Sequence, residues 1–137
     1  MWFILAILSA FFAAVTSILA KLGMGDISSN LATAVRTTVV LFMAWGMVAI
    51  TGSGNQLHNL SQKDWIFLIL SGIATGLSWL CYYKAIQIGE VSKVVPIDKF
   101  SIVITIVLAA LILKETLTLK VLMGVLFITI GTFIMIL

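Results

Sequence analysis

Long apolar runs separated by short polar breaks dominate the pattern along the chain. The runs cover residues 2–20, 31–50, 64–88, 91–113 and 118–137. Each run is close to the roughly 20 apolar residues with which an α-helix crosses a bilayer. Membrane β-strands would instead alternate in polarity over about ten residues each. The pattern therefore predicts an all-α integral membrane protein with five transmembrane helices, in which every backbone group is bonded inside its own helix.

The breaks between the runs carry turn and capping residues. Residues 23–30 combine glycines with aspartate, serines and asparagine, which is typical of a helix stop followed by an N-cap. Residues 51–64 form the one sizeable loop, and its Ser61-x-x-Asp64 spacing is a capping-box pattern just before an apolar run. We therefore expect one compact domain over residues 1–137, without room for a soluble domain.

The composition agrees with a membrane protein and argues against several other classes. Of the 137 residues, 62% are hydrophobic and only 9% are charged, against about 25% charged in a soluble domain. The eight lysines and arginines do not cluster, so a nucleic-acid partner is not expected. The lone Cys81 allows neither an intrachain disulfide nor a thiolate metal site. No nucleophile–base pair, carboxylate pair or phosphate loop is visible, so we expect no enzyme, metal or cofactor.

The flanking lysines give almost no signal for the orientation of the helices. Three lie on the side of Met1 and three on the opposite side, namely Lys63, Lys114 and Lys120 against Lys21, Lys84 and Lys93. Such residues normally decide which side faces the cytoplasm. A balanced count is expected of a chain that inserts both ways, although a single, weakly biased topology gives the same count. Five crossings would place the two ends on opposite sides of the membrane.

Asp98 and Lys99 stand side by side inside the fourth run. If that helix begins near Val91, the pair lies roughly 10–12 Å along its axis. Ionisable groups at such depth face a protein interior or a water-filled cavity and mark function. Ser101 and Thr105 share the helix face of Asp98, whereas Lys99 points about 100° away and is not expected simply to pair with Asp98. In the alternative, the helix starts later and Lys99 snorkels to the headgroups.

Arg36 is another charge inside an apolar run, the second one. Its long side chain can snorkel to the headgroups. Alternatively, its guanidinium can pair with Asp98 from the same side of the membrane. Together with Lys99, Arg36 would make a cavity net positive, which favours a solute with a carboxylate over a bare organic cation.

The third run carries a polar stripe at helical spacing, which consists of Ser71, Thr75, Ser78 and Tyr82. Such a stripe can line a cavity together with Trp79 and Tyr83, although these aromatic residues are also typical of an interfacial belt. Small residues at helical spacing let helices pack closely, either within the chain or between two copies. The candidates for such packing are Gly72, Gly76, Gly124 and Gly131.

Several short motifs, by their order and spacing, resemble the EamA domain of the drug/metabolite transporter superfamily. They are Arg36, residues 60–65 (LSQKDW), residues 82–86 (YYKAI), residues 89–92 (GEVS), Pro96, residues 113–118 (LKETLT), Gly124 and Gly131. The match covers nearly the whole chain; each motif alone is weak, and their combination is specific. One departure is Lys114, since many members have glycine before the glutamate.

The resemblance implies one half of an inverted-repeat transporter. Typical members carry two such domains and ten helices in one chain, with the halves inverted, whereas this chain carries one copy over residues 1–137. The chain is also distantly similar to the small multidrug resistance proteins, which have four helices and form antiparallel dimers. The first helix here lacks the membrane-embedded glutamate of those proteins, so their proton-coupled export of cations is not carried over.

Together these features predict a multi-pass protein of the inner or plasma membrane that transports small organic solutes or metabolites, with export as the expected direction. The expected partners are the solute, the bilayer and a second copy or a paralogue, in a dimer that works by alternating access. The candidate substrate or coupling residues are Asp98, Lys99, Arg36, Ser101, Thr105, Ser71, Thr75, Ser78, Trp79, Tyr82 and Tyr83. The alternative is a non-transporting membrane subunit that assembles with a larger or paralogous partner.

Overall fold

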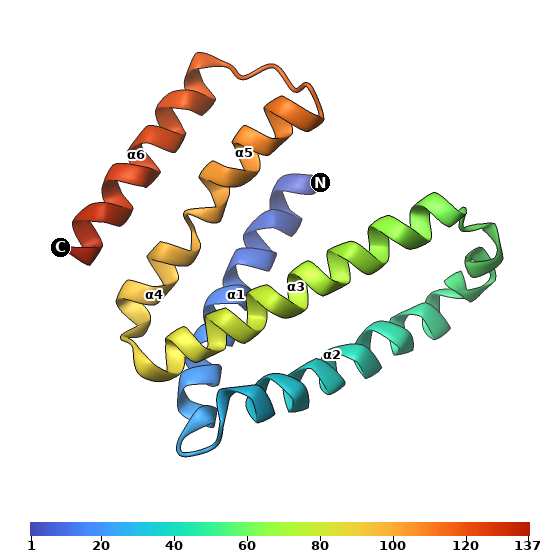
Figure 1. The fold of residues 1–137 in the computed structure, drawn as a ribbon. Coiled ribbons are helices and arrows are strands. Elements are labelled where there is room, and N and C mark those ends of the chain that lie inside the picture. The colour runs from blue at the N-terminus through green and yellow to red at the C-terminus, as the bar shows by residue number, and fades with distance from the viewer. The chain divides into compact units, whose positions relative to one another are not determined.

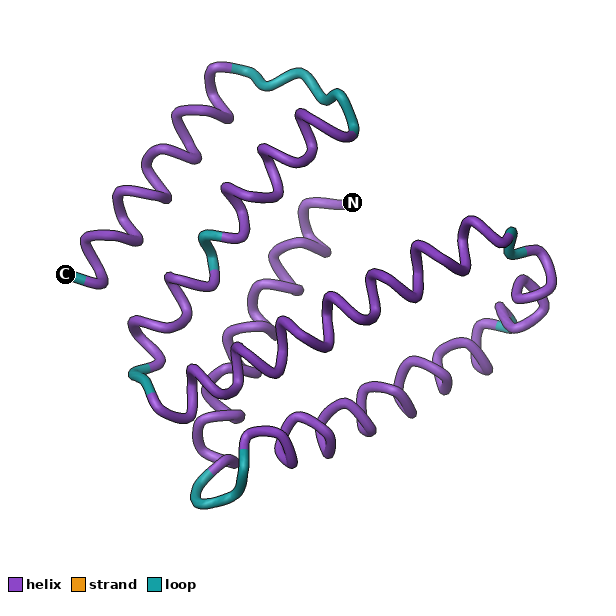
Figure 2. The backbone as a smooth tube through the Cα atoms, viewed as in Figure 1, coloured by secondary structure: helices purple, strands orange, loops and turns teal.

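The computed structural model describes residues 1–137 and contains helices but no strand (Figures 1 and 2). The helices are α1 Trp2–Met24, α2 Ser29–Thr51, the 3-10 helix η1 Ser53–Asn59, α3 Gln62–Ile88, α4 Val91–Asp98, α5 Ser101–Ile112 and α6 Leu119–Ile136. Five stretches are long and apolar enough to span a membrane, and α4 and α5 together form one of them. The prediction of an all-α membrane protein with five crossings is therefore confirmed.

Three helices, α2, α3 and α6, begin where the sequence supplies a side-chain cap. The side chain of Ser28 accepts a hydrogen bond from the backbone N–H of Leu31 at 3.2 Å, which starts α2. Thr118 does the same for the N–H of Val121 at 3.4 Å at the start of α6. Gly52 ends α2 with a left-handed backbone, φ 67°, as expected for a residue that follows a helix and has no Cβ.

The capping box before α3 forms as predicted from the sequence. The Ser61 hydroxyl accepts a hydrogen bond from the backbone N–H of Asp64 at 3.2 Å. In return, the Asp64 carboxylate accepts one from the backbone N–H of Ser61 at 3.0 Å. Two amide groups that have no partner inside the helix are thereby satisfied at once, which sets the start of the third span.

The fourth span is interrupted, whereas the sequence pattern predicted one helix over residues 91–113. α4 ends at Asp98 and α5 begins at Ser101. Pro96 lies inside α4 and has no N–H to offer to the carbonyl four residues before it. Beyond it the backbone tightens, so that the N–H of Phe100 bonds the carbonyl of Ile97 at 2.9 Å, three residues back instead of four.

The turn between α5 and α6 contains the one non-glycine residue with a positive φ, Lys114 at 55°. A left-handed backbone brings the Cβ of an L-residue too close to the neighbouring carbonyl oxygen, which is why glycine is favoured there. This conformation supplies a physical reason for the glycine that many members of the resembled family have at this position.

The chain divides into two compact units. The first unit consists of Met1–Ser17 and Ile88–Leu137, in which α4 and α5 lie alongside α6 (Figure 1). The second unit, Ile18–Gln87, holds the end of α1, η1, α2 and α3. Within it, α2 and α3 run in opposite directions.

The second unit has a small core where the end of α1, the start of α2 and the end of α3 come together. Its buried apolar and polar residues are Ala20, Met24, Ser29, Ala32, Thr33, Tyr83 and Ile86. The ammonium of Lys21 donates to the backbone carbonyls of Ile86 at 2.7 Å and Gln87 at 3.2 Å. The last carbonyls of α3 have no partner inside the helix, so Lys21 caps α3 from α1. The Gln87 side chain in turn donates to the carbonyl of Ile27 at 2.7 Å.

The five spans bury little of their surface within a single chain. In the apolar 18-residue window of each span, between 0% and 11% of the residues are buried. Inside a bilayer, such surfaces are covered by lipid or by other helices, and helices associate where close packing or polar contacts favour it. Each of the two units, taken by itself, therefore leaves wide faces of its helices exposed.

Candidate functional site

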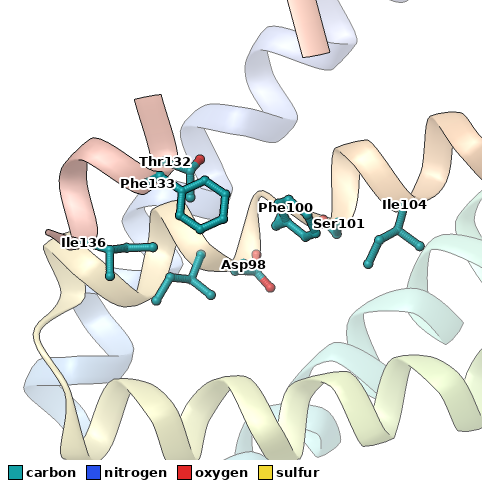
Figure 3. A pocket seen from close by; sticks show the side chains of 8 residues that line it. Asp98, Phe100, Ser101, Ile104, Thr132, Phe133 and Ile136 are labelled. Atoms are coloured by element: carbon teal, nitrogen blue, oxygen red, sulfur yellow. The ribbon is translucent and has the colours of Figure 1, made fainter. Parts of the chain in front are cut away.

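The first unit contains a pocket at the interruption between α4 and α5. Its volume is about 440 Å³, and it opens between these helices and α6 (Figure 3). The lining side chains are Ile97, Asp98, Phe100, Ser101, Ile104, Thr132, Phe133 and Ile136. Ligand pockets in proteins commonly enclose about 300–1,000 Å³, so this space is large enough for a small organic molecule.

Asp98 is the only charged residue that lines this pocket. It is the last residue of α4, and Ser101 is the first of α5, so the interruption places a carboxylate and a hydroxyl at the same opening. α6 contributes Thr132, which is 7% exposed, and the ring of Phe133 (Figure 3). The surface of the pocket is nevertheless almost wholly apolar, and these polar residues contribute only a small part of it.

Lys99 lies against Asp98, contrary to the expectation that it would point away. Its ammonium is 3.4 Å from the Asp98 carboxylate. The expectation assumed one continuous helix, in which adjacent residues diverge by about 100°. Because α4 ends at Asp98, the long side chain of Lys99 can fold back onto the carboxylate. The Lys99 side chain is 51% exposed and that of Asp98 35% exposed, so solvent weakens the attraction between them.

Thr105 does not line this pocket. It is exposed on α5, and the lining on that helix comes from Ser101 and Ile104. Of the three residues predicted to share a face, Asp98 and Ser101 line the pocket together and Thr105 does not.

Arg36 and Tyr83 meet in the second unit. The guanidinium carbon of Arg36 lies 4.1 Å from the centre of the Tyr83 ring, and Tyr83 is only 3% exposed. Stacking of a guanidinium on an aromatic face is a favourable cation–π contact. One nitrogen of Arg36, Nη1, is buried without a hydrogen-bond partner. This contact was not among the arrangements predicted for Arg36, and its pairing with Asp98 stays a prediction.

A second, more open pocket of about 320 Å³ lies between α2 and α3. Its lining residues are Asn30, Thr33, Ala34, Thr37, Thr38, Leu41, Gly76 and Leu80. The α2 threonines were not among the predicted site residues, although Thr33 and Thr37 stand on either side of Arg36 in the sequence. Their hydroxyls donate to carbonyls of their own helix, for example Thr37 to Thr33 at 2.7 Å, so these hydrogen bonds stay within α2.

The polar stripe of α3 is mostly exposed in the single chain. Ser71, Thr75 and Ser78 are all exposed, and the Thr75 hydroxyl donates to the carbonyl of Ser71 at 2.9 Å. Trp79 is half-buried. Tyr82 is half-buried too and contacts Tyr83 edge-on, with the ring centres 5.3 Å apart. None of these six residues lines either pocket, and their role at a substrate site stays a prediction.

The candidate packing glycines have free space around them. A Cβ placed on Gly72, Gly76, Gly124 or Gly131 would meet no neighbouring atom within 4 Å. Within its own unit, no other helix packs closely against any of these four positions. That they pack against another helix, within the chain or in a second copy, stays a prediction.

No three His, Cys, Asp or Glu side chains lie together, so the chain offers no ready metal site. A small apolar pocket with a single acid and no cluster of reactive groups can bind a solute.

Comparison with known proteins agrees with this picture. A model described as the EamA-like transporter family matches residues 1–137. A protein of Sinorhizobium sp, named as an uncharacterized transporter in the cobO 3' region, is 42% identical over 134 residues, which are 98% of this chain and 95% of that protein. An uncharacterized protein of Methanocaldococcus jannaschii is 39% identical over 70 residues, 51% of each chain. No solved structure matches the chain.

Proposed function

We propose that this chain, which belongs to the EamA-like transporter family, carries small organic solutes or metabolites across the inner or plasma membrane as an antiparallel homodimer. Family membership and the relative named as a transporter identify a membrane transporter, and the five spans identify a multi-pass protein. The dimer, the alternating-access mechanism and export as the direction are our proposal.

The observation that carries the proposal is the pocket beside Asp98 at the interrupted fourth span. Transporters commonly place their solute and ion sites where a membrane helix is discontinuous, because the break frees polar backbone groups. An ionisable residue inside a span is costly and is usually retained for function. Here the break, the carboxylate and an opening of about 440 Å³ occur together.

The need for a second copy is supported by the exposed spans. At most 11% of the residues in the apolar 18-residue window of any span are buried, and Ser71, Thr75 and Ser78 on α3 are exposed. A second copy would cover part of these faces and supply the five further helices that two-domain members carry in one chain. The 134 aligned residues are 95% of the Sinorhizobium protein, and the 70 aligned residues are 51% of the Methanocaldococcus jannaschii protein. Both relatives are therefore about as long as this chain.

The antiparallel arrangement is supported by the number of spans and by the balance of charges. In a dimer, each copy supplies one half of the transporter with five helices. The two halves are inverted relative to one another only if one copy inserts into the membrane in the opposite direction. The flanking lysines, three on each side, do not oppose either orientation. In such a dimer, alternating access would arise as one copy rocks against the other around the site.

The experiment that tests the arrangement is the sidedness of the C-terminus in intact cells, read with a tag that is detectable on both sides. We expect a near-equal split between the two sides. A fusion to a membrane protein of known single orientation is the control. A single orientation would overturn the antiparallel homodimer.

Charge variants sharpen this test. Adding lysines with Gln56→Lys and Asn59→Lys should retain the loop of residues 51–64 in the cytoplasm, and Lys63→Gln with Lys114→Gln should favour the opposite orientation. When the two variants are expressed together, we expect an affinity-tagged copy of one variant to co-purify the other. When tagged and untagged copies of the same variant are expressed together, we expect no co-purification. Co-purification of like-oriented copies would instead indicate a parallel assembly.

The same exposed spans also fit the alternative, a non-transporting subunit that folds with a larger or paralogous partner. Reconstitution of the purified chain alone into proteoliposomes distinguishes the two. Uptake of a labelled solute by the chain alone supports the transporter. If uptake occurs only after a second, different membrane protein is added, the subunit hypothesis takes its place.

A further inference from the structure

We infer that Arg36, held against the ring of Tyr83, is the binding group for an oxyanion, a carboxylate or phosphate group that comes from outside the chain. The site lies in the second unit, between α2 and α3. The inference goes beyond the proposed function, which places the solute beside Asp98 and gives Arg36 no role.

The chain supplies no counter-ion for Arg36. Its ion pairs join Lys93 to Glu90 and Lys99 to Asp98, each at 3.4 Å. The carboxylates before and within the fourth span therefore already have a lysine beside them. A charged side chain inside a span is costly and is usually paired. An anion from outside the chain would supply the opposite charge that Arg36 lacks.

Arg36 also has donors without acceptors. Its Nη1 is buried and has no hydrogen-bond partner. The Tyr83 ring, 4.1 Å from the guanidinium carbon, offers a negative face but not the lone pairs of an oxygen acceptor. A guanidinium presents its N–H groups in a planar fork that matches the two oxygens of a carboxylate or phosphate. An oxyanion would therefore satisfy the donors and the charge of Arg36 together.

Tyr83 restrains the guanidinium before any anion binds. The tyrosine is only 3% exposed and belongs to the small core of the second unit, in which Ile86 is fully buried. The ring therefore cannot turn away without disturbing that core, whereas Arg36 is only half-buried and remains accessible. A binding group that is already positioned loses less conformational freedom when its ligand arrives.

The pocket between α2 and α3 offers space for the body of an organic anion. Its volume is about 320 Å³, and its surface is mostly apolar. Thr33 stands three residues before Arg36 and Leu80 three residues before Tyr83, and both line this pocket. Residues three apart are neighbours on a helix surface, so the pocket begins within one turn of the Arg36–Tyr83 contact on both helices. An apolar group can lie there while its charged end reaches Arg36.

The test is titration calorimetry on the purified chain in phosphatidylcholine nanodiscs, with benzoate and the neutral benzamide as probes of equal size. Empty nanodiscs correct for partition into lipid. We expect benzoate to bind at least about tenfold more tightly than benzamide, the scale of a hydrogen bond to a charged group. Arg36→Gln should remove this preference. Arg36→Lys keeps the charge but loses the planar fork, and should retain only part of it.

The matched control is Lys84→Gln, which removes an equal charge from the residue next to Tyr83. Lys84 is exposed and donates to the side chain of Gln87 at 3.3 Å. We expect this control to leave the preference for benzoate unchanged. Tyr83→Leu should weaken benzoate binding and Tyr83→Phe should not, because only leucine removes the aromatic face. Equal losses in Lys84→Gln and Arg36→Gln would indicate a general attraction to positive charge and would overturn the inference.

A second measurement distinguishes a solute from a lipid headgroup as the source of the oxyanion. Native mass spectrometry of the chain, purified with phosphatidylglycerol, reports the lipid that stays bound. Lipid retained by the wild type and lost in Arg36→Gln, without a preference for benzoate, would identify a lipid phosphate. A preference for benzoate without such retention would identify a solute. If neither benzoate binding nor lipid retention depends on Arg36, the inference is wrong.

These measurements report binding and do not require transport. Anion binding that depends on Arg36, without uptake of any solute in proteoliposomes, would leave the inference standing and contradict the proposed function. Uptake that is equal in the wild type and Arg36→Gln, without a preference for benzoate or retained lipid, would do the reverse.

Discussion

The guanidinium of Arg36 on α2 lies over the ring of Tyr83 on α3, with 4.1 Å between its central carbon and the centre of the ring. This contact joins two antiparallel spans near the small core of the second unit, where Tyr83 and Ile86 are buried. A charge that would be costly among apolar side chains is thereby placed on the electron-rich face of a ring. The contact explains how a membrane helix tolerates this arginine within a single chain.

We expect Tyr83→Leu to lower the stability of the chain by about 1–2 kcal/mol, because a desolvated cation–π contact is lost. Tyr83→Phe keeps the aromatic face and should cost clearly less. Unfolding in mixed micelles, followed by tryptophan fluorescence, measures both. In an Arg36→Met background the difference between the leucine and phenylalanine variants should shrink. An unchanged difference would show that the ring acts through apolar packing alone.

Lys114→Gly should stabilise the chain by about 0.5–1 kcal/mol, because it relieves the left-handed strain but adds freedom to the unfolded chain. The backbone of Lys114 has φ 55°. Lys114→Ala is the matched control: it removes the same charge but keeps the Cβ, and should change stability little. If alanine and glycine stabilise equally, the charge of Lys114 and not its backbone is the cause.

Lys21→Met should destabilise the second unit by about 1–2 kcal/mol, since the last carbonyls of α3 lose a charged donor. The ammonium of Lys21 bonds the carbonyls of Ile86 and Gln87. The same unfolding assay measures the effect, and hydrogen exchange should rise at the end of α3. Lys120→Met, at the exposed start of α6, is the control. Equal effects of the two substitutions would contradict a specific cap.

Asp98→Asn should abolish any dependence of uptake on a pH gradient, because an amide cannot take up a proton. Uptake of a labelled solute at saturating concentration is compared in proteoliposomes with and without an imposed gradient. Asp98→Glu, which keeps a carboxylate, should retain the dependence. Gradient-driven uptake that persists in Asp98→Asn would exclude this residue as the coupling group. A wild-type chain that ignores the gradient would not be coupled to protons.

Local features were predictable wherever short-range chemistry decides the structure. The Ser61–Asp64 capping box formed as expected, because its hydrogen bonds join residues only three apart. The five spans were predictable because an apolar run of this length must satisfy its backbone inside one helix. The family resemblance was likewise visible in the order of short motifs and is confirmed over residues 1–137.

The candidate site was only partly predictable. The sequence pointed to Asp98 as an intramembrane acid but treated the fourth span as one helix, which put Thr105 at the site and turned Lys99 away. Pro96, which lies inside α4 and has no backbone N–H, is the one residue near the interruption whose type disfavours a regular helix. The Arg36–Tyr83 contact was also missed. The two residues stand far apart in the sequence, and nothing in the pattern of either helix indicates which ring an arginine will meet.

The sequence by itself determined that the chain is a five-span membrane protein of this family, because span length, apolar content and caps act locally. Only the tertiary structure decided that α6 completes a pocket beside Asp98, that Lys99 folds back onto that carboxylate and that Lys21 caps α3. Each of these depends on where a helix ends and which other segment lies within a few ångströms of it. Such contacts arise from the packing of the whole unit, and no local pattern of residues encodes them.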